Sequence, residues 1–268
     1  MIAPTVLSPL LGKQLGGQQP FRIRGIPGRL HPADSMLAVP NEAGLAHYLR
    51  AGRSAMEVIL WAVSACRVSG SDVQSALDFA CGYGRVTRHL RSSFPGVRLT
   101  VCDLDPGGVN FCREEFRARG MVSTERFDGL DLGENHDLIM VGSLFTHLPA
   151  DLFQVLLTLL GSALSPGGVL VITTHGPSCL DHAAIYGPHV TDMEKSLRSD
   201  LDASGHAYVP YPGRESYGVA FTTETGIARF IHGADVGLKL RGRWVRGWDE
   251  HQDVYALIRC GSFRPRAT

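Results

Sequence analysis

The clearest signal in the sequence is Leu77-Asp78-Phe79-Ala80-Cys81-Gly82-Tyr83-Gly84-Arg85, an apolar run that passes through a glycine-containing turn into a helical pattern. A turn between a strand and a helix needs small residues where a ligand approaches the main chain closely, because a Cβ there would collide with the ligand. Gly82 and Gly84 meet this need. The stretch therefore predicts a strand, a ligand-binding turn and a helix.

An acidic residue follows at the end of the next predicted strand. Asp103 stands nineteen residues after Gly84, in the run Val101-Cys102-Asp103-Leu104. A carboxylate at this strand end can accept hydrogen bonds from both hydroxyls of a ribose. A glycine pair alone is more often an ordinary turn than a site, so it is the combination with Asp103 that predicts a nucleoside cofactor.

The same stretch distinguishes between two such cofactors. The dinucleotide fingerprint requires a third glycine, where a helix N-terminus meets the pyrophosphate, and this chain has Thr87 at that place. Asp78 also adds negative charge beside the turn, which disfavours a pyrophosphate and favours a cofactor that carries a sulfonium and an ammonium group. These residues favour S-adenosylmethionine over NAD.

Outward from this stretch, short apolar runs alternate with helical patterns. Strands are expected at 76–80, 97–103, 122–127, 137–142 and 169–174, and helices at 85–93, 107–118 and 149–164. Such alternation predicts right-handed crossovers and a doubly wound, mostly parallel α/β sheet of the Rossmann-like type. Before it, Asn41 is a plausible N-cap of one or two helices that reach about Cys66 and are interrupted by Gly52.

The two ends of the chain depart from this pattern. Residues 1–40 hold six prolines and predict an irregular N-terminal arm. Residues 177–222 break the alternation and predict an inserted lid or substrate cap after the fifth strand, with a fixed element that mediates contacts of a homodimer as the alternative. A helix near 223–231, capped by Thr222 or Thr223, and strands near 236–240 and 254–259 complete a domain over 41–268.

Composition limits the partners of the protein. Lysine and arginine together number 26, as do aspartate and glutamate, so no net charge favours nucleic acid or a membrane surface, and a small-molecule substrate is expected. The six cysteines form neither a zinc-type pattern nor a disulfide framework, and no metal is expected. The sequence shows no leader pattern and no long apolar run, which predicts a cytoplasmic protein.

At these residues the sequence resembles the class I S-adenosylmethionine-dependent methyltransferases of bacteria, in four blocks over 76–175. The resemblance implies a seven-stranded sheet and cofactor contacts from residues 78–84, where Ala80 replaces a common glycine. It also implies that Asp103 holds the ribose, that Leu104 lies beside the adenine, and that Asp128 reaches the adenine amino group, with Asp131 as second choice. The later blocks are Gly142-Ser143-Leu144-Phe145-Thr146-His147-Leu148-Pro149, with Ser143 as a cofactor contact, and Leu164-Ser165-Pro166-Gly167-Gly168-Val169-Leu170.

Further residues carry weaker expectations. His147 follows the fourth strand and His175 ends the fifth, on the side where the transferred methyl group points in this family, so either imidazole is a candidate general base. Tyr48 and Arg85 are candidate contacts to the methionine end of the cofactor, although core packing explains Tyr48 better and a salt bridge to an acid at the sheet edge explains Arg85 equally well. Four aromatic residues of 177–222 are candidates to line a substrate pocket: Tyr208, Tyr211, Tyr217 and Phe221.

Three classes of function remain open from the sequence. A methyltransferase that acts on an oxygen or nitrogen atom of a small molecule agrees with all four blocks. A non-catalytic cofactor-binding module would retain the same binding residues. An NAD-dependent oxidoreductase is opposed by Thr87 and by the Leu164-Ser165-Pro166-Gly167-Gly168 turn.

Overall fold

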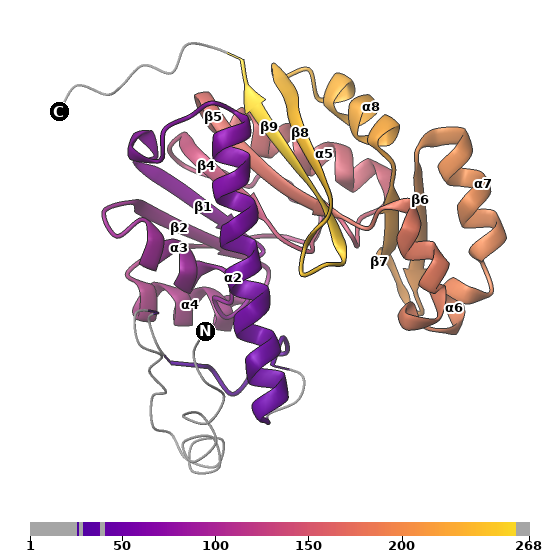
Figure 1. The fold of residues 1–268 in the computed structure, drawn as a ribbon, viewed down its shortest axis with the longest axis horizontal. Coiled ribbons are helices and arrows are strands. Elements are labelled where there is room, and N and C mark those ends of the chain that lie inside the picture. The colour runs from indigo at the N-terminus through magenta and orange to yellow at the C-terminus, as the bar shows by residue number, and fades with distance from the viewer. Residues whose placement is uncertain (1–25, 27–28, 38–40, 261–268) are drawn as a thin grey trace.

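A central seven-stranded sheet with the strand order β3-β2-β1-β4-β5-β9-β8 organises the computed structural model, which describes residues 26, 29–37 and 41–260 (Figure 1). The five strands from β3 to β5 are parallel, whereas β9 runs antiparallel to both β5 and β8. The strands are β1 (Ser75–Phe79), β2 (Arg98–Asp103), β3 (Arg119–Val122), β4 (His136–Val141), β5 (Leu164–Thr174), β8 (Leu238–Trp248) and β9 (Gln252–Arg259). The predicted doubly wound, mostly parallel sheet is confirmed.

Helices cover both faces of this sheet. On one face α2 packs on β5, β8 and β9 and shares a core with Ala76, Leu138 and Met140. On the other face α5 shares a core with Leu77 and Ile139. Both faces of β1 and β4 are thus covered, which explains why every residue of these strands is buried. The helices are α2 (Glu42–Ala65), α3 (Thr87–Ser93), α4 (Pro106–Phe116), α5 (Ala150–Ser162) and α8 (Glu224–Ala234), with a 3₁₀ turn η2 (Gly70–Asp72).

Local signals placed several boundaries correctly and missed others. The Asn41 side chain accepts a hydrogen bond from the Gly44 N–H, as an N-cap does, and Thr223 caps α8 in the same way. Gly52 does not interrupt α2. The helix continues through it, and the absence of a side chain there makes room for His89, since a Cβ on Gly52 would stand 2.5 Å from Nε2 of His89.

The largest differences concern strands at the sheet edges. The strand expected at 122–127 is β3 and ends at Val122, and the strand expected at 236–240 continues as β8 to Trp248. Edge strands alternate less regularly between buried and exposed residues, as β8 shows, so periodicity places their ends poorly.

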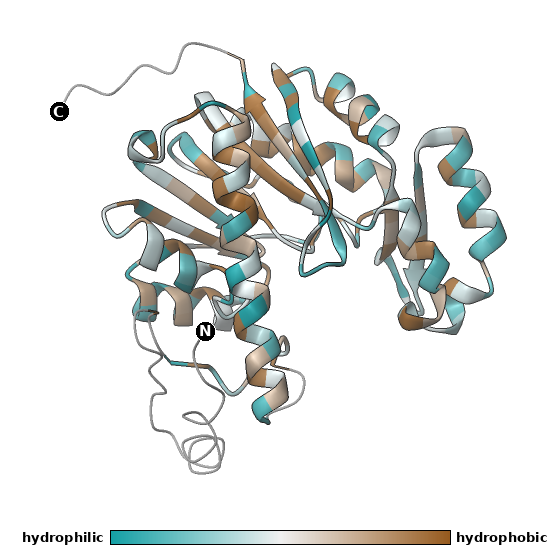
Figure 2. Ribbon diagram, in the orientation of Figure 1, coloured by the Kyte–Doolittle hydropathy of each residue, from teal (hydrophilic) through white to brown (hydrophobic). Residues whose placement is uncertain are grey.

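Residues 177–222 form a separate layer beside the sheet (Figure 1). The segment contains η3 (Pro177–Tyr186), α6 (Pro188–Thr191), α7 (Glu194–Ser204) and the antiparallel pair β6 (His206–Tyr211) and β7 (Arg214–Thr222). It has its own small core around Leu180, Leu197 and Val219. Figure 2 shows the central strands as largely hydrophobic and α7 as largely hydrophilic, in line with an addition outside the main core.

Strand β7 attaches this layer to the main domain. The N–H of Gly218 donates to the carbonyl of His147 at 3.0 Å, and the N–H of Ala220 donates to that of Thr146 at 2.8 Å. The N–H of Thr222 donates to the carbonyl of His175 at 2.8 Å. The layer therefore lies against the ends of β4 and β5.

The N-terminal arm expected at 1–40 lies mostly outside the described residues. Residues 29–37 are described and contain no helix or strand. No described helix has both the length and the apolar composition that a membrane span requires.

Candidate active site

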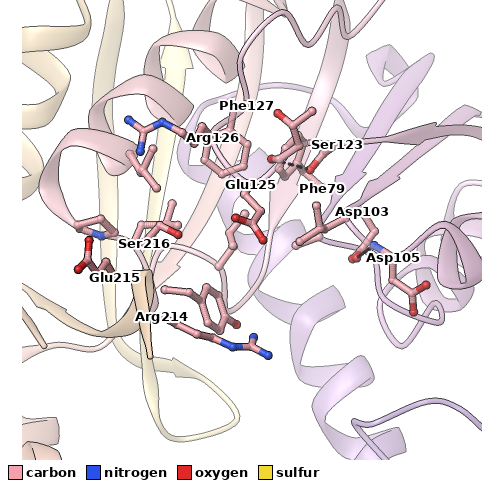
Figure 3. Close-up of a pocket in the computed structure, with 18 of the residues that line it drawn as sticks. Phe79, Asp103, Asp105, Ser123, Glu125, Arg126, Phe127, Arg214, Glu215 and Ser216 are labelled. Atoms are coloured by element: carbon pink, nitrogen blue, oxygen red, sulfur yellow. Dashed lines mark hydrogen bonds between the residues drawn. The ribbon is translucent and has the colours of Figure 1, made fainter. Parts of the chain in front are cut away.

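A pocket of about 1390 Å³ opens at the carboxyl edge of the parallel strands. Its sheet side consists of the ends of β1 and β2 and of residues 123–127 after β3. Its other side consists of residues between 144 and 152, of Gly213 in the β6–β7 turn and of the start of β7, 214–217 (Figure 3). The strand order reverses between β1 and β4, and ligands of open α/β sheets bind outside the carboxyl ends at such a switch point. The pocket occupies this place.

The turn after β1 presents an open position at Gly82. This glycine has a φ of +50°, and a Cβ built on it meets no atom within 4 Å. Its N–H donates to Oδ2 of Asp103 at 2.7 Å, which joins the turn to the end of β2. The turn therefore leaves the space that a ligand would need to approach the main chain at Gly82.

Gly84 has a different reason to be glycine. A Cβ on Gly84 would stand 2.3 Å from the ring of Phe116 in α4. The residue thus allows α4 to pack against the turn, and the contact of Gly84 with a cofactor stays a prediction. Gly108, which sequence reasoning missed, allows the same approach, since its Cβ would stand 2.5 Å from the Gly82 carbonyl oxygen.

Ala80 lines the pocket in a conformation that suits glycine better. Its φ is +64°, and a left-handed conformation costs an alanine about 1 kcal/mol or more. Its N–H donates to the carbonyl of Cys102 at 2.7 Å, and this bond holds the strained residue in place. The side chain is accommodated, as expected from its small size.

Asp103 ends β2 and lines the pocket. Besides the Gly82 N–H, its carboxylate accepts the N–H of Asp105 at 2.9 Å on the other oxygen. Each carboxylate oxygen can accept a second hydrogen bond, so both remain able to receive a ribose hydroxyl. Leu104 beside it lines the pocket with 52% of its surface exposed, which leaves an apolar platform suited to a flat base.

The structure corrects the acid that was expected to reach the adenine. The Asp128 side chain is 80% exposed, its nearest ion-pair partner is Arg126 at 3.9 Å, and it does not line the pocket. Asp131 accepts the N–H of Gly133 and also lies outside the pocket. Glu125, however, lines the pocket opposite Asp103 (Figure 3). Because β3 ends at Val122, the first acid after the strand is Glu125; the prediction of Asp128 followed from the resemblance of residues 127–132 to the family.

Two of the candidate contacts to the methionine end are buried beneath the turn. Tyr48 is completely buried in α2, and its hydroxyl donates to Asp34 at 2.7 Å. Asp78 is 2% exposed and accepts the hydroxyl of Thr87 at 2.6 Å, and burial raises the pKa of its carboxyl to about 7. Neither lines the pocket. We therefore assign both to the support of the turn and not to direct contact.

Arg85 and Ser143 lie near the turn but outside the pocket lining. The Arg85 guanidinium stands over the ring of Trp248, 5.4 Å from its centroid. The Ser143 N–H donates to Thr173 at 2.9 Å, and its hydroxyl accepts from Gln252 at 2.7 Å. The expected salt bridge of Arg85 is replaced by a cation–π contact, and Ser143 belongs to a hydrogen-bonded group that joins the ends of β4, β5 and β9.

The His147 ring lies directly behind the wall of the pocket. It stacks on Tyr217, which lines the pocket, with ring centroids 4.7 Å apart and an angle of 25°. Its Nδ1 lies 2.6 Å from the carbonyl oxygen of Gly218. A carbonyl only accepts, so Nδ1 carries the proton and Nε2 remains able to accept one. Burial lowers the pKa of His147, which keeps the imidazole neutral at pH 7.

His175 lies deeper than expected. It is 5% exposed, packs against Tyr186, Phe221 and His251, and does not line the pocket. Burial lowers the pKa of its imidazole to about 3. The structure gives His175 a packing role, and we do not carry it into the mechanism.

Comparison with known proteins agrees with this geometry. Residues 77–170 match the family model described as a methyltransferase domain. Over 142 residues the chain is 26% identical to a malonyl-[acyl-carrier protein] O-methyltransferase of Brevibacillus brevis, a match that covers 49% of this chain and 50% of that protein. The chain thus spans about half the length of that curated relative.

Solved structures share the fold at low identity. A S-adenosylmethionine-dependent methyltransferase from Clostridium acetobutylicum aligns with a TM-score of 0.52 and 13% identity, over 78% of this chain and 92% of that one. The mitomycin 7-O-methyltransferase MmcR aligns with a TM-score of 0.54 and 15% identity, over 82% of this chain and 56% of that one. The domain match, the seven-stranded sheet and the position of the pocket agree with one another: residues 77–170 match a methyltransferase domain, and the chain has the fold of the S-adenosylmethionine-dependent methyltransferases with which it aligns.

Proposed function

We propose that this protein transfers the methyl group of S-adenosylmethionine to an oxygen or nitrogen atom of a small molecule. The observation that carries the proposal is that the open position at Gly82, the Asp103 carboxylate and the exposed Leu104 all lie at one edge of the sheet. Gly82 leaves room for a ligand to approach the main chain, Asp103 can accept the hydroxyls of a ribose, and Leu104 offers a surface to a base.

The residues present fit the cofactor. An adenosine in the pocket would cover the exposed side chain of Leu104 with its base, while its ribose hydroxyls would donate to the Asp103 carboxylate. Glu125, on the neighbouring strand end, is placed to accept a base amino group, and we propose it in place of Asp128. When bound, the sulfonium cofactor supplies an already activated methyl group.

The protein has correspondingly little covalent chemistry to perform. Its residues must hold the cofactor and the acceptor in line and exclude water. Leu144, Leu148 and Leu152 give the acceptor side an apolar surface, and the β6–β7 turn covers it from the opposite side. The balanced net charge of the chain supports a small acceptor over a nucleic acid. The Brevibacillus relative and the mitomycin enzyme are both named as O-methyltransferases, which supports oxygen as the acceptor atom.

The first prediction concerns the ribose-binding carboxylate. Asp103→Ala should weaken S-adenosylmethionine binding about 10- to 100-fold, because a charged hydrogen-bond acceptor is worth about 1.5–3 kcal/mol. Isothermal titration calorimetry measures this change directly. Unchanged affinity in the folded variant would contradict the assignment and with it the proposed function.

Two further variants sharpen that measurement. Asp128→Ala removes an acid of the same type outside the pocket and should bind the cofactor as the wild type does. Asp103→Asn keeps the size of the side chain and one acceptor oxygen, and therefore one of the two bonds that the carboxylate accepts from the N–H groups of Gly82 and Asp105, so its affinity should lie between those of wild type and Asp103→Ala. Cofactor binding without methylation of any acceptor would indicate a non-catalytic binding module, and tighter binding of NAD would indicate an oxidoreductase.

The second prediction concerns His147, which we propose as general base through Nε2. His147→Gln should lower kcat about 100-fold or more for a hydroxyl acceptor and leave the affinity for S-adenosylmethionine unchanged. Because burial lowers the pKa of His147 below its ordinary value of 6.5, the wild-type rate should rise with pH through a pKa below 6.5 and be level at pH 7. A pH profile with the same rising limb in His147→Gln would exclude this role.

The third prediction concerns residues 177–222, which we propose as a cap over the acceptor. The support is that residues 213–217, at the end of this segment's hairpin, line the pocket. Amide hydrogen exchange around the β6–β7 turn should slow when S-adenosylhomocysteine and an acceptor are added together. Equal protection with and without ligands would instead support a fixed element, such as the surface of a homodimer.

A further inference from the structure

One aromatic ring that lines the pocket is stacked on a second ring of the protein. Tyr217 lines the pocket from β7, and His147 stacks against it at 4.7 Å and 25°. Tyr211 stands beside both rings, with centroids 5.7 Å from Tyr217 and 6.0 Å from His147. Tyr217 is therefore backed by a planar ring on the protein side, while it lines the pocket itself.

The backbone holds this ring in place. Next to Tyr217 along the chain, Gly218 is bonded twice to His147: its N–H donates to the His147 carbonyl at 3.0 Å, and its own carbonyl accepts from the imidazole at 2.6 Å. A Cβ on Gly218 would stand 2.1 Å from the carbonyl oxygen of Val209, so β6 and β7 pack tightly there. Such a ring is pre-organised, and a ligand that stacks on it spends little free energy on ordering it.

The electrostatics of this wall suit a neutral ring. Burial raises the pKa of Tyr217 to about 12, so its phenol is uncharged at pH 7. Leu144, Leu148 and Leu152 give the acceptor side an apolar part, beside the charged Asp151, Arg214 and Glu215. The volume of about 1390 Å³ exceeds the range of roughly 300–1,000 Å³ that is usual for sites of a single drug-sized ligand. The pocket therefore has room for an acceptor of more than one ring beside a nucleoside.

We propose that the methyl acceptor is a planar aromatic alcohol whose ring stacks on the pocket side of Tyr217, and that Tyr217 determines this specificity. The inference rests on the proposed function and adds its substrate class. The acceptor would continue the stack that His147 and Tyr217 begin, so its ring would be separated from His147 by the Tyr217 ring, and its hydroxyl would have to extend past the edge of that ring to meet Nε2 of His147.

The test uses two alcohols of similar size and different shape. The full-length protein is saturated with S-adenosylhomocysteine and titrated by calorimetry with 2-naphthol and, separately, with trans-decahydro-2-naphthol. An aromatic pair contributes about 0.5–1.5 kcal/mol beyond buried area, so 2-naphthol should bind about 2- to 12-fold more tightly. Tyr217→Leu should remove this preference, and the matched variant Tyr217→Phe should retain it.

The outcomes separate the inference from the function on which it rests. Equal binding of the two alcohols, binding of neither, or a preference that persists in Tyr217→Leu overturns the inference. So does loss of S-adenosylhomocysteine binding in a folded Tyr217→Leu, because the ring would then cover the cofactor. A wild-type protein that does not bind S-adenosylhomocysteine overturns the proposed function itself. If Tyr217→Leu does not fold, the wild-type preference between the two alcohols still decides.

Discussion

Replacing Gly82 by valine should abolish binding of S-adenosylmethionine while the protein stays folded. A Cβ at this position meets no protein atom within 4 Å, so the branched side chain fits the protein and extends into the space that we assign to the cofactor. We expect the dissociation constant to rise more than roughly 100-fold, which corresponds to about 2.7 kcal/mol. Calorimetric titration of wild type and variant measures the change.

The backbone strain of the variant has a matched control. Gly82 has a φ of +50°, a region in which a side chain costs about 1–2 kcal/mol. Gly129 has a φ of +66°, its Cβ position is equally open, and it does not line the pocket. Gly129→Val should therefore lose a similar amount of stability and keep its affinity. If both variants bind as the wild type does, the cofactor does not approach this turn.

Acid should destabilise the protein strongly, because several histidines are buried in the neutral form. Burial lowers the pKa of His175 to about 3 and the pKa values of His89 and His206 to about 4. Within the described residues, Nε2 of His89 and Nε2 of His206 have no hydrogen-bond partner, as suits an unprotonated nitrogen. The unfolded chain, with histidine pKa values near 6.5, binds more protons, so stability is lost as the pH falls below 6.5.

The size of the loss follows from the pKa differences. Between pH 7 and pH 5 each of the three histidines should cost about 2 kcal/mol. Asp78 has the opposite effect, because its pKa is raised to about 7 in the folded protein. Its protonation between pH 7 and pH 5 should raise the free energy of unfolding by about 2 kcal/mol. The net loss in the free energy of unfolding should be about 4 kcal/mol, measured by urea unfolding at pH 7, 6 and 5.

Asp78→Asn tests the two contributions separately. Asparagine keeps an oxygen that can accept the Thr87 hydroxyl, whereas the titrating carboxyl is gone. The loss between pH 7 and pH 5 should increase to about 6 kcal/mol, and the variant should be more stable than wild type above pH 7. A free energy of unfolding that does not change over this range in either protein would show that the histidines are not buried as the structure has them.

The alternation of strands and helices, the glycine turn and Asp103 could all be predicted from the sequence. Each depends on residues close together in the chain, where periodicity and turn chemistry act directly. The distance from Gly84 to Asp103 is one helix and one strand, so their meeting at one sheet edge follows from the right-handed crossover alone. For the same reason Gly82 could be assigned before its surroundings were known.

Tertiary structure alone decided which residues face the pocket. Strand β3 ends at Val122 because of its pairing with β2 and not because of the pattern within β3. This end makes Glu125, and not Asp128, the acid that we propose for the adenine. The contact of Gly84 with Phe116, 32 residues later in the sequence, depends on how α4 packs. The stack of His147 on Tyr217 exists because β7 pairs with the segment after β4. Local sequence sets the type of an element, but its ends and its neighbours are set by long-range pairing and packing, which residues distant in the chain determine together.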